Sequence, residues 1–149
     1  MNTRSKLIAA PAALFVPVLA FAAFTIPARA DDPAMQPLHL VKECSQWTGQ
    51  PGDYCSIIKS DLEAIPVGTR IFYYGPLMAS VVLSSIIVID AGGGSTAIGN
   101  CSVNNTESTG TCSFWAGSGA LRGFQALVTL SVDPNGTDYH WDGSYAMVN

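Results

Sequence analysis

Apolar segments with the composition of β-strands are separated by polar, turn-forming sequences over most of the second half of the chain, and residues 124–132 alternate in part between hydrophobic and polar. The segments with this pattern are rich in β-branched and aromatic residues and cover 69–74, 80–90, 97–103, 110–115, 124–132 and 139–147. Turn-forming sequences separate them, with Gly92-Gly93-Gly94 and Asp133-Pro134-Asn135-Gly136 as the sharpest. Helical periodicity is limited to one expected turn over residues 60–65, which Pro66 ends. The pattern predicts an all-β domain of six or seven strands.

The spacing of the turns is typical of a β-sandwich or an up-and-down β-barrel, because a turn signal occurs about every ten residues. Gly117, Gly119 and Gly123 lie beside predicted strands. Glycines at such places are used for bulges and sharp bends where a sheet curls toward closure. We therefore expect a closed antiparallel barrel rather than a sandwich.

The four cysteines form two pairs with the same spacing, Cys44 with Cys55 and Cys101 with Cys112. Three connectivities are possible, and local pairing is the one we favour in an oxidising compartment. A four-thiolate zinc site is the alternative, but zinc knuckles have two to four residues between paired cysteines, far fewer than either pair has here. We expect two disulfides and no metal at the cysteines.

The first thirty residues have the features of an export signal. Arg4 and Lys6 precede an apolar stretch over residues 7–24, and Ala28-Arg29-Ala30 is a small-x-small cleavage site. The alternative is a retained membrane anchor, which two prolines in the apolar stretch disfavour. We expect a signal peptide over 1–30, a flexible lead-in over 31–40 and one β-barrel domain over 41–149, secreted or periplasmic and not inserted in a membrane after cleavage.

The net charge of the expected mature protein argues against some classes of binding partner. Without the three cations of the predicted signal, four basic residues remain against eleven acidic ones, a net charge of −7. So few cations cannot neutralise many phosphates, which argues against nucleic acid and against anionic membrane surfaces as partners.

Several segments resemble one superfamily of β-barrels. The run GTCSFWAGSGALRGFQALV over residues 110–128 is similar to the part of the allene oxide cyclase and dirigent barrels in which a strand leads through a Gly-Ser-Gly turn into another strand. IPVGTRIFYY over 65–74 and YHWDGSY over 139–145 resemble bacterial exported members of that group. The resemblance covers residues 44–148, and its glycines report on the fold more than on activity.

This resemblance implies an eight-stranded antiparallel barrel, often in a homo-oligomer, whose lumen binds a small hydrophobic ligand. Plant relatives steer the cyclisation or radical coupling of such a ligand by confinement, without a cofactor. An enzyme of this kind would be a cofactor-independent isomerase or cyclase. The strand TRIFYYGP lacks the glutamate that the plant cyclases place inside the barrel, so catalytic residues stay unassigned. The alternative is a non-catalytic structural or interaction protein of the cell envelope with a packed barrel.

Eight residues are candidates for ligand binding. An arginine inside a barrel could hold a carboxylate, a tyrosine could donate to a carbonyl, and a tryptophan could line a cavity or fill the core. The aspartate could act as a base or cap a turn, and the histidine could move a proton near neutral pH. These candidates are Arg70, Tyr73, Tyr74, Asp90, Trp115, Arg122, His140 and Trp141.

Overall fold

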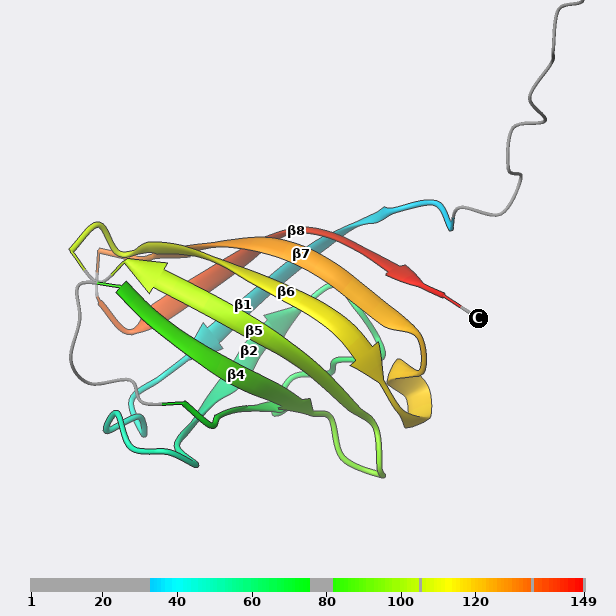
Figure 1. The fold of residues 1–149 in the computed structure, drawn as a ribbon, viewed down its shortest axis with the longest axis horizontal. Coiled ribbons are helices and arrows are strands. Elements are labelled where there is room, and N and C mark those ends of the chain that lie inside the picture. The colour runs from blue at the N-terminus through cyan, green and yellow to red at the C-terminus, as the bar shows by residue number, and fades with distance from the viewer. Residues whose placement is uncertain (1–32, 76–81, 105, 135, 149) are drawn as a thin grey trace, which may run out of the picture. The chain divides into compact units, whose positions relative to one another are not determined.

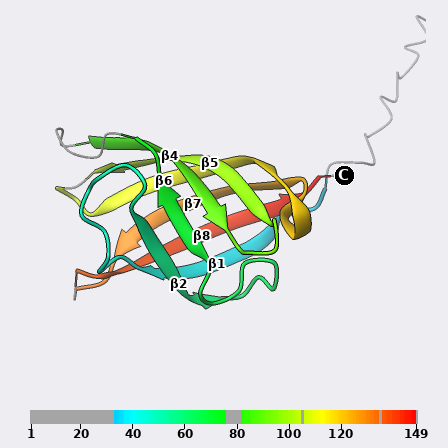
Figure 2. The ribbon, with the colours of Figure 1, turned by 90° about the horizontal axis from the view of Figure 1, so that it is seen from below.

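Eight antiparallel strands close into a barrel in the computed structural model, which describes residues 33–75, 82–104, 106–134 and 136–148 (Figure 1). Each strand pairs with the next along the chain, and β8 pairs with β1 to complete the ring (Figure 2). The strands are β1 (Gln36–Glu43), β2 (Tyr54–Ser60), β3 (Arg70–Tyr73), β4 (Val82–Asp90), β5 (Thr96–Asn104), β6 (Thr109–Gly117), β7 (Phe124–Val132) and β8 (Asp138–Met147). This arrangement confirms the predicted closed, eight-stranded, all-β barrel.

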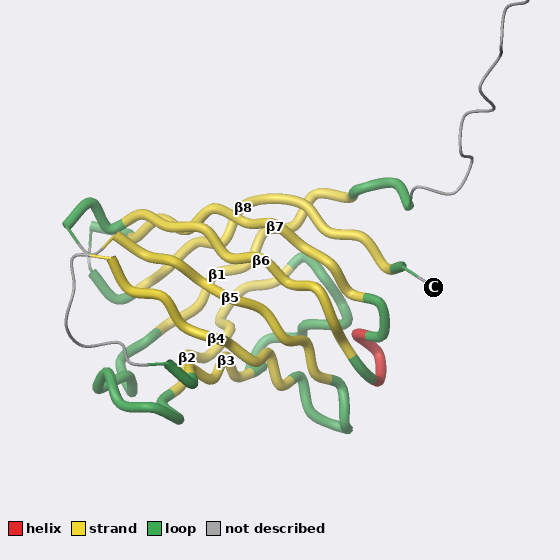
Figure 3. Tube along the Cα trace, in the orientation of Figure 1, coloured by secondary structure: helices red, strands yellow, loops and turns green. Residues whose placement is uncertain are grey.

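Two strands are absent from the sequence prediction. β1 and β2 flank the loop that contains the first cysteine pair, and residues 36–40 of the expected flexible lead-in belong to β1, which is paired on both sides. The predicted helical turn over 60–65 is instead a hydrogen-bonded turn in which Ile65 N–H donates to the Leu62 carbonyl. The helix found in the described residues is the short 3₁₀ helix η1 (Gly119–Leu121), drawn red in Figure 3.

On several strands the side chains alternate between the lumen and the outer surface. β7 shows this most clearly, since its residues from Phe124 to Leu130 are buried at every second position. Aromatic rings fill the middle of the lumen, where Phe114 contacts both Phe124 and Trp141 with ring centroids 5.7 and 5.6 Å apart. The core is therefore a continuous cluster of buried side chains that includes these rings.

The two ends of the barrel differ. Ile65 from the β2–β3 loop and Leu121 from η1 are fully buried and close one end. At the other end lie both disulfides, Cys44–Cys55 and Cys101–Cys112, which confirms the predicted pairing. Two disulfides are typical of an oxidising, non-cytoplasmic environment. In the described part of the chain, no helix has the length and apolar character needed to cross a membrane.

Candidate functional site

A lysine lies inside the disulfide-bearing end of the barrel. Lys42 follows Leu38 and Leu40 at two-residue intervals on β1, so its side chain points to the same side as theirs, into the lumen. The pairing of β1 with β2 shifts register between Val41 and Lys42, because Ile58 of β2 has no partner in this ladder. Val41 and Lys42 are both buried. Only 3% of the Lys42 surface is exposed. A fully buried lysine is rare in proteins, which makes this the most informative polar group of the lumen.

Aromatic rings surround the Lys42 amine. Its Nζ donates a hydrogen bond to the hydroxyl oxygen of Tyr73. The same Nζ lies 5.0 Å from the ring centroids of Tyr73, Tyr139 and Trp141. The faces of aromatic rings attract a cation at this distance. Tyr73 belongs to β3, whereas Tyr139 and Trp141 belong to β8. The amine is thus fixed by one hydrogen bond and three ring faces.

Burial changes the proton equilibria of this pair. Desolvation lowers the pKa of Lys42 to about 7, and no carboxylate contributes to that shift in the described residues. Desolvation also raises the pKa of Tyr73, with a smaller contribution from the neighbouring Tyr139. Near neutral pH the amine is therefore divided between its charged and neutral forms, while the Tyr73 phenol keeps its proton.

A small cavity adjoins the amine. Its volume is about 60 Å³, and its lining is predominantly apolar, with Lys42, Tyr73 and Ser85 as polar contributors among Cys44, Trp47, Cys55, Cys101, Val103, Leu130 and Tyr139. The indole N–H of Trp47 is buried without a hydrogen-bond partner. A cavity of roughly 150 Å³ accepts benzene, so this one has room for a few non-hydrogen atoms. It suits the polar end of a small molecule or a very small molecule as a whole.

The predicted binding residues are divided between lumen and surface. Tyr73 lines the cavity, and Trp141 is fully buried beneath the Lys42 amine. The other six lie away from the cavity, with His140 partly buried on the outer face and the rest exposed: Arg70, Tyr74, Asp90, Trp115 and Arg122. Of the two adjacent tyrosines, one faces inward as predicted.

Two of the outward residues have evident local roles. The guanidinium of Arg70 stacks on the ring of Tyr54, 4.9 Å from its centroid, on the outside of the barrel. The Asp90 carboxylate accepts a hydrogen bond from the Gly92 N–H at 3.0 Å, so it stabilises the β4–β5 turn, the simpler of its two predicted roles.

Sequence reasoning did not select Lys42. The signal was present in the two-residue spacing of Leu38, Leu40 and Lys42, which places a cation on the apolar face of a strand. It becomes visible only when residues 36–43 are assigned to a strand. Tyr139 and Trp47, which complete the surroundings of the amine, come from distant segments that the barrel brings together.

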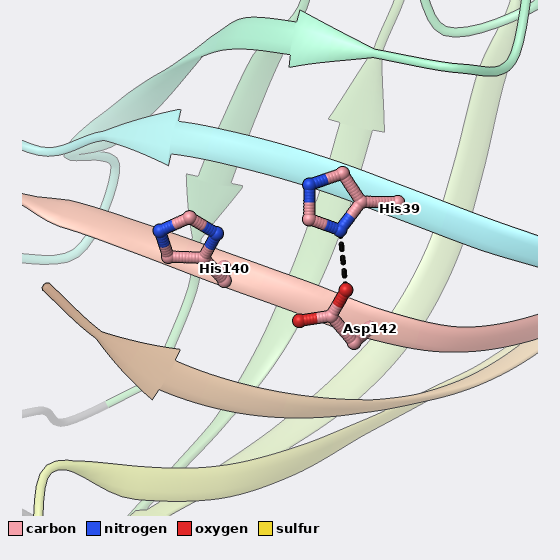
Figure 4. A group of neighbouring side chains, drawn as sticks. All are labelled: His39, His140 and Asp142. Atoms are coloured by element: carbon pink, nitrogen blue, oxygen red, sulfur yellow. Dashed lines mark hydrogen bonds and ion pairs between the residues drawn. The ribbon is translucent and has the colours of Figure 1, made fainter.

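On the outer face of the same strands, His140 lies beside His39 and Asp142 (Figure 4). These three residues could hold a metal ion, because each offers one ligand atom and the three atoms lie within 4.8 Å of one another. Barrel closure between β1 and β8 creates this group, which therefore belongs to the surface and not to the lumen.

No protein-family model matches the chain, and no characterised protein or solved structure shows significant similarity to it. The resemblance to allene oxide cyclase and dirigent barrels stays a prediction.

Proposed function

We propose that this protein is an exported barrel that binds a small apolar molecule through a carbonyl group at Lys42. The observation that carries the proposal is the buried amine, with its pKa of about 7, at the wall of an apolar cavity. A lysine desolvated in this way has a neutral fraction near pH 7 and is an activated nucleophile toward carbonyl carbon. Exposed lysines lack this property.

The geometry supports a defined reaction. The neutral amine adds to the carbonyl carbon, and a proton moves from nitrogen to oxygen to give a carbinolamine. Loss of water, with its oxygen taken from the carbonyl, then gives an imine, and the reverse reaction releases the ligand. Tyr73 accepts the Lys42 N–H, which leaves its own hydroxyl hydrogen free to donate to the ligand oxygen. Tyr73 would thus act on the oxygen and Lys42 on the carbon.

The size of the cavity defines the ligand. About 60 Å³ admits a carbonyl and a few carbon atoms, as in a short aldehyde or ketone. A folded polyunsaturated chain of the kind a cyclase confines needs more space than this. We therefore propose binding and reversible capture, and do not extend the proposal to cyclisation or coupling.

Export is part of the proposal. The signal over residues 1–30 would direct the chain out of the cytoplasm, with Asp31 as the first residue of the mature protein. The two disulfides agree with that destination.

Reductive trapping tests the proposal. The purified, disulfide-bonded protein is incubated with propanal and cyanoborohydride near pH 7, and the modified residues are located by peptide mapping. We expect saturable modification of Lys42 that is much faster than modification of Lys59, the exposed lysine on β2. Lys42→Met, which keeps an unbranched side chain one atom shorter, should abolish it, and Lys59→Met should leave it unchanged.

Modification of the two lysines at equal rates, or no modification of Lys42, would contradict the proposal. Such a result would favour a lumen that is only a packed core, as in a structural protein of the envelope. A cavity that admits propanal but excludes cyanoborohydride would also leave Lys42 unmodified. A second readout is therefore the fluorescence of the tryptophans, of which Trp47 lines the cavity and Trp141 lies beside the amine. A saturable change with propanal that Lys42→Met removes would support the proposal independently of reduction.

A further inference from the structure

The chain contains two histidines, and the fold brings both to one place. His39 is on the first strand and His140 on the last, and the closure of the barrel between β1 and β8 makes them neighbours. Their ring centroids are 5.8 Å apart on the outer face (Figure 4). The chain is otherwise poor in basic side chains, so this meeting of both imidazoles is a distinctive surface feature.

A carboxylate completes the group. In the β1–β8 ladder His39 is directly opposite Asp142, and His140 lies two residues before Asp142, on the same face of β8. Nδ1 of His39 is hydrogen-bonded to the carboxylate of Asp142. One potential ligand atom from each of the three residues lies within 4.8 Å of the other two. Because the backbone belongs to paired strands of a closed barrel, the positions of the three Cβ atoms are fixed.

A second set of carboxylates holds the histidines in place. Nε2 of His140 lies 3.0 Å from Oδ1 of Asp133, which favours the tautomer with hydrogen on Nε2 and leaves the Nδ1 lone pair available. The backbone N–H of His39 donates to both carboxylate oxygens of Asp61, at 3.0 and 3.1 Å. Metal-binding histidines almost always donate their second ring N–H to a carboxylate or carbonyl, as His140 does to Asp133.

We propose that His39, His140 and Asp142 form a surface binding site for a late first-row divalent metal ion, of which Zn²⁺ is the test case. Two imidazoles and one carboxylate are a usual protein donor set for Zn²⁺, with water as the fourth ligand. Ligands of a tetrahedral zinc ion lie roughly 3.4 Å apart, given bonds of about 2.1 Å, so modest rotations of exposed side chains close the site. Half of the His39 side chain is exposed, so packing leaves room for such a rotation.

The metal would replace the contact between His39 and Asp142, since Nδ1 of His39 and the carboxylate would then bind the ion. The net charge of −7 for residues 31–149 attracts cations to the protein as a whole. The proposed site is independent of the proposed carbonyl binding, because its side chains point outward from β1 and β8 while Lys42 points inward. Either proposal can fail without the other.

Isothermal titration calorimetry with ZnCl₂ on the purified, disulfide-bonded protein tests the site. We expect one equivalent per chain, with binding lost in His140→Ala and in Asp142→Asn. Asp133→Asn removes no ligand, and should weaken Zn²⁺ binding by about 10- to 100-fold by releasing the His140 ring. Glu107→Gln, which removes an exposed carboxylate from the β5–β6 turn, is the matched control and should bind as the parent protein does.

Nuclear magnetic resonance of the imidazole nitrogens supplies a readout that needs no variant. Zn²⁺ should shift the signals of both histidines together, with His140 bound through Nδ1. A response from one histidine alone, a stoichiometry of one ion per two chains, or parent-like binding by Asp133→Asn would each overturn the proposal in this form.

Discussion

Lys42 shows how strongly one buried charge shapes the stability of this protein. Its pKa is lowered from 10.5 to about 7 by burial, and each pKa unit corresponds to ~1.4 kcal/mol of differential interaction. Below pH 7 the amine is charged in both states, and the folded protein bears the full cost of burying that charge. Between about pH 7 and 10 the folded protein releases the proton while the unfolded chain keeps it. The Lys42 contribution to the free energy of unfolding therefore rises with pH across this window.

Lys42→Met removes this titration. We expect the stability of the Met variant relative to the parent protein to fall by about 2 kcal/mol between about pH 7 and about pH 9, because only the parent gains from deprotonation. Urea unfolding at several pH values measures it, and Lys59→Met, on the exposed side of β2, controls for the loss of a surface cation. A pH-independent difference between parent and Met variant would show that Lys42 is not desolvated as its burial implies.

A side chain at Gly123 would meet two obstacles, a positive φ and a close backbone contact, whereas one at Gly136 would meet the positive φ alone. Its φ is +73°, and an added Cβ would lie 1.8 Å from the Val148 carbonyl oxygen. Gly136 has nearly the same φ, +76°, with nothing within 4 Å of an added Cβ. Gly136→Ala should cost about 1 to 2 kcal/mol from backbone strain alone. Gly123→Ala should cost at least about 3 kcal/mol in chemical denaturation, because overpacking is added. Equal losses would rule out the clash.

At the scale of elements, the two disulfides form a matched pair. Each joins cysteines separated by 11 residues, but Cys101–Cys112 spans a regular hairpin and Cys44–Cys55 an irregular loop. In the chain-entropy model the stabilisation depends on loop length, so each double Cys→Ala variant should lose ~3 kcal/mol by urea unfolding. A difference above about 1 kcal/mol between the two would show that packing at the cavity, and not loop entropy, decides their contribution.

The residue pattern of each strand explains whether that strand could be predicted from the sequence. β3 to β8 could be predicted because segments rich in β-branched and aromatic residues cover them and turn sequences separate most of them. β1 was not predicted because Leu40, Val41 and Lys42 are buried in succession, which breaks its alternation, and because two charged residues end it. β2 was not predicted because only Cys55 and Ile57 of its seven residues are buried. Without β1, the inward lysine cannot be inferred, because it depends on the assignment of this strand. The meeting of His39 with His140 cannot be inferred either, because it depends on the β1–β8 register.

At the scale of the whole molecule, β1 and β8 present different chemistry on their two faces. Along β8, Tyr139 and Trp141 face the Lys42 amine, while His140 and Asp142 face solvent beside His39. This division follows from the two-residue period of side chains on a strand. One pair of strands thus supplies part of the aromatic surroundings of the Lys42 amine and the whole cluster on the surface.

The ladders between neighbouring strands differ in length, and the shortest ladder predicts where the barrel opens locally. β2 and β3 share three ladder pairs, Tyr54↔Phe72, Cys55↔Ile71 and Ser56↔Arg70, whereas β4–β5 and β7–β8 are paired along nine residues each. Loop hydrogen bonds extend the short seam, as where Ile57 N–H donates to the Thr69 carbonyl, but they do not lengthen β3. Local openings follow the segments with the fewest stabilising contacts.

Native-state hydrogen exchange should therefore find the amide of Ile71 in β3 at least roughly tenfold less protected than that of Val128 in the middle of β7, although both side chains are fully buried. Matched burial makes this pair a direct test, because the two amides then differ chiefly in the length of the ladders around them. Equal protection would mean that the barrel opens only as a whole, with the short seam as stable as the long ones. Faster exchange in β3 would instead identify the β2–β3 ladder as the part of the barrel that opens first. This ladder lies next to the Cys44–Cys55 disulfide.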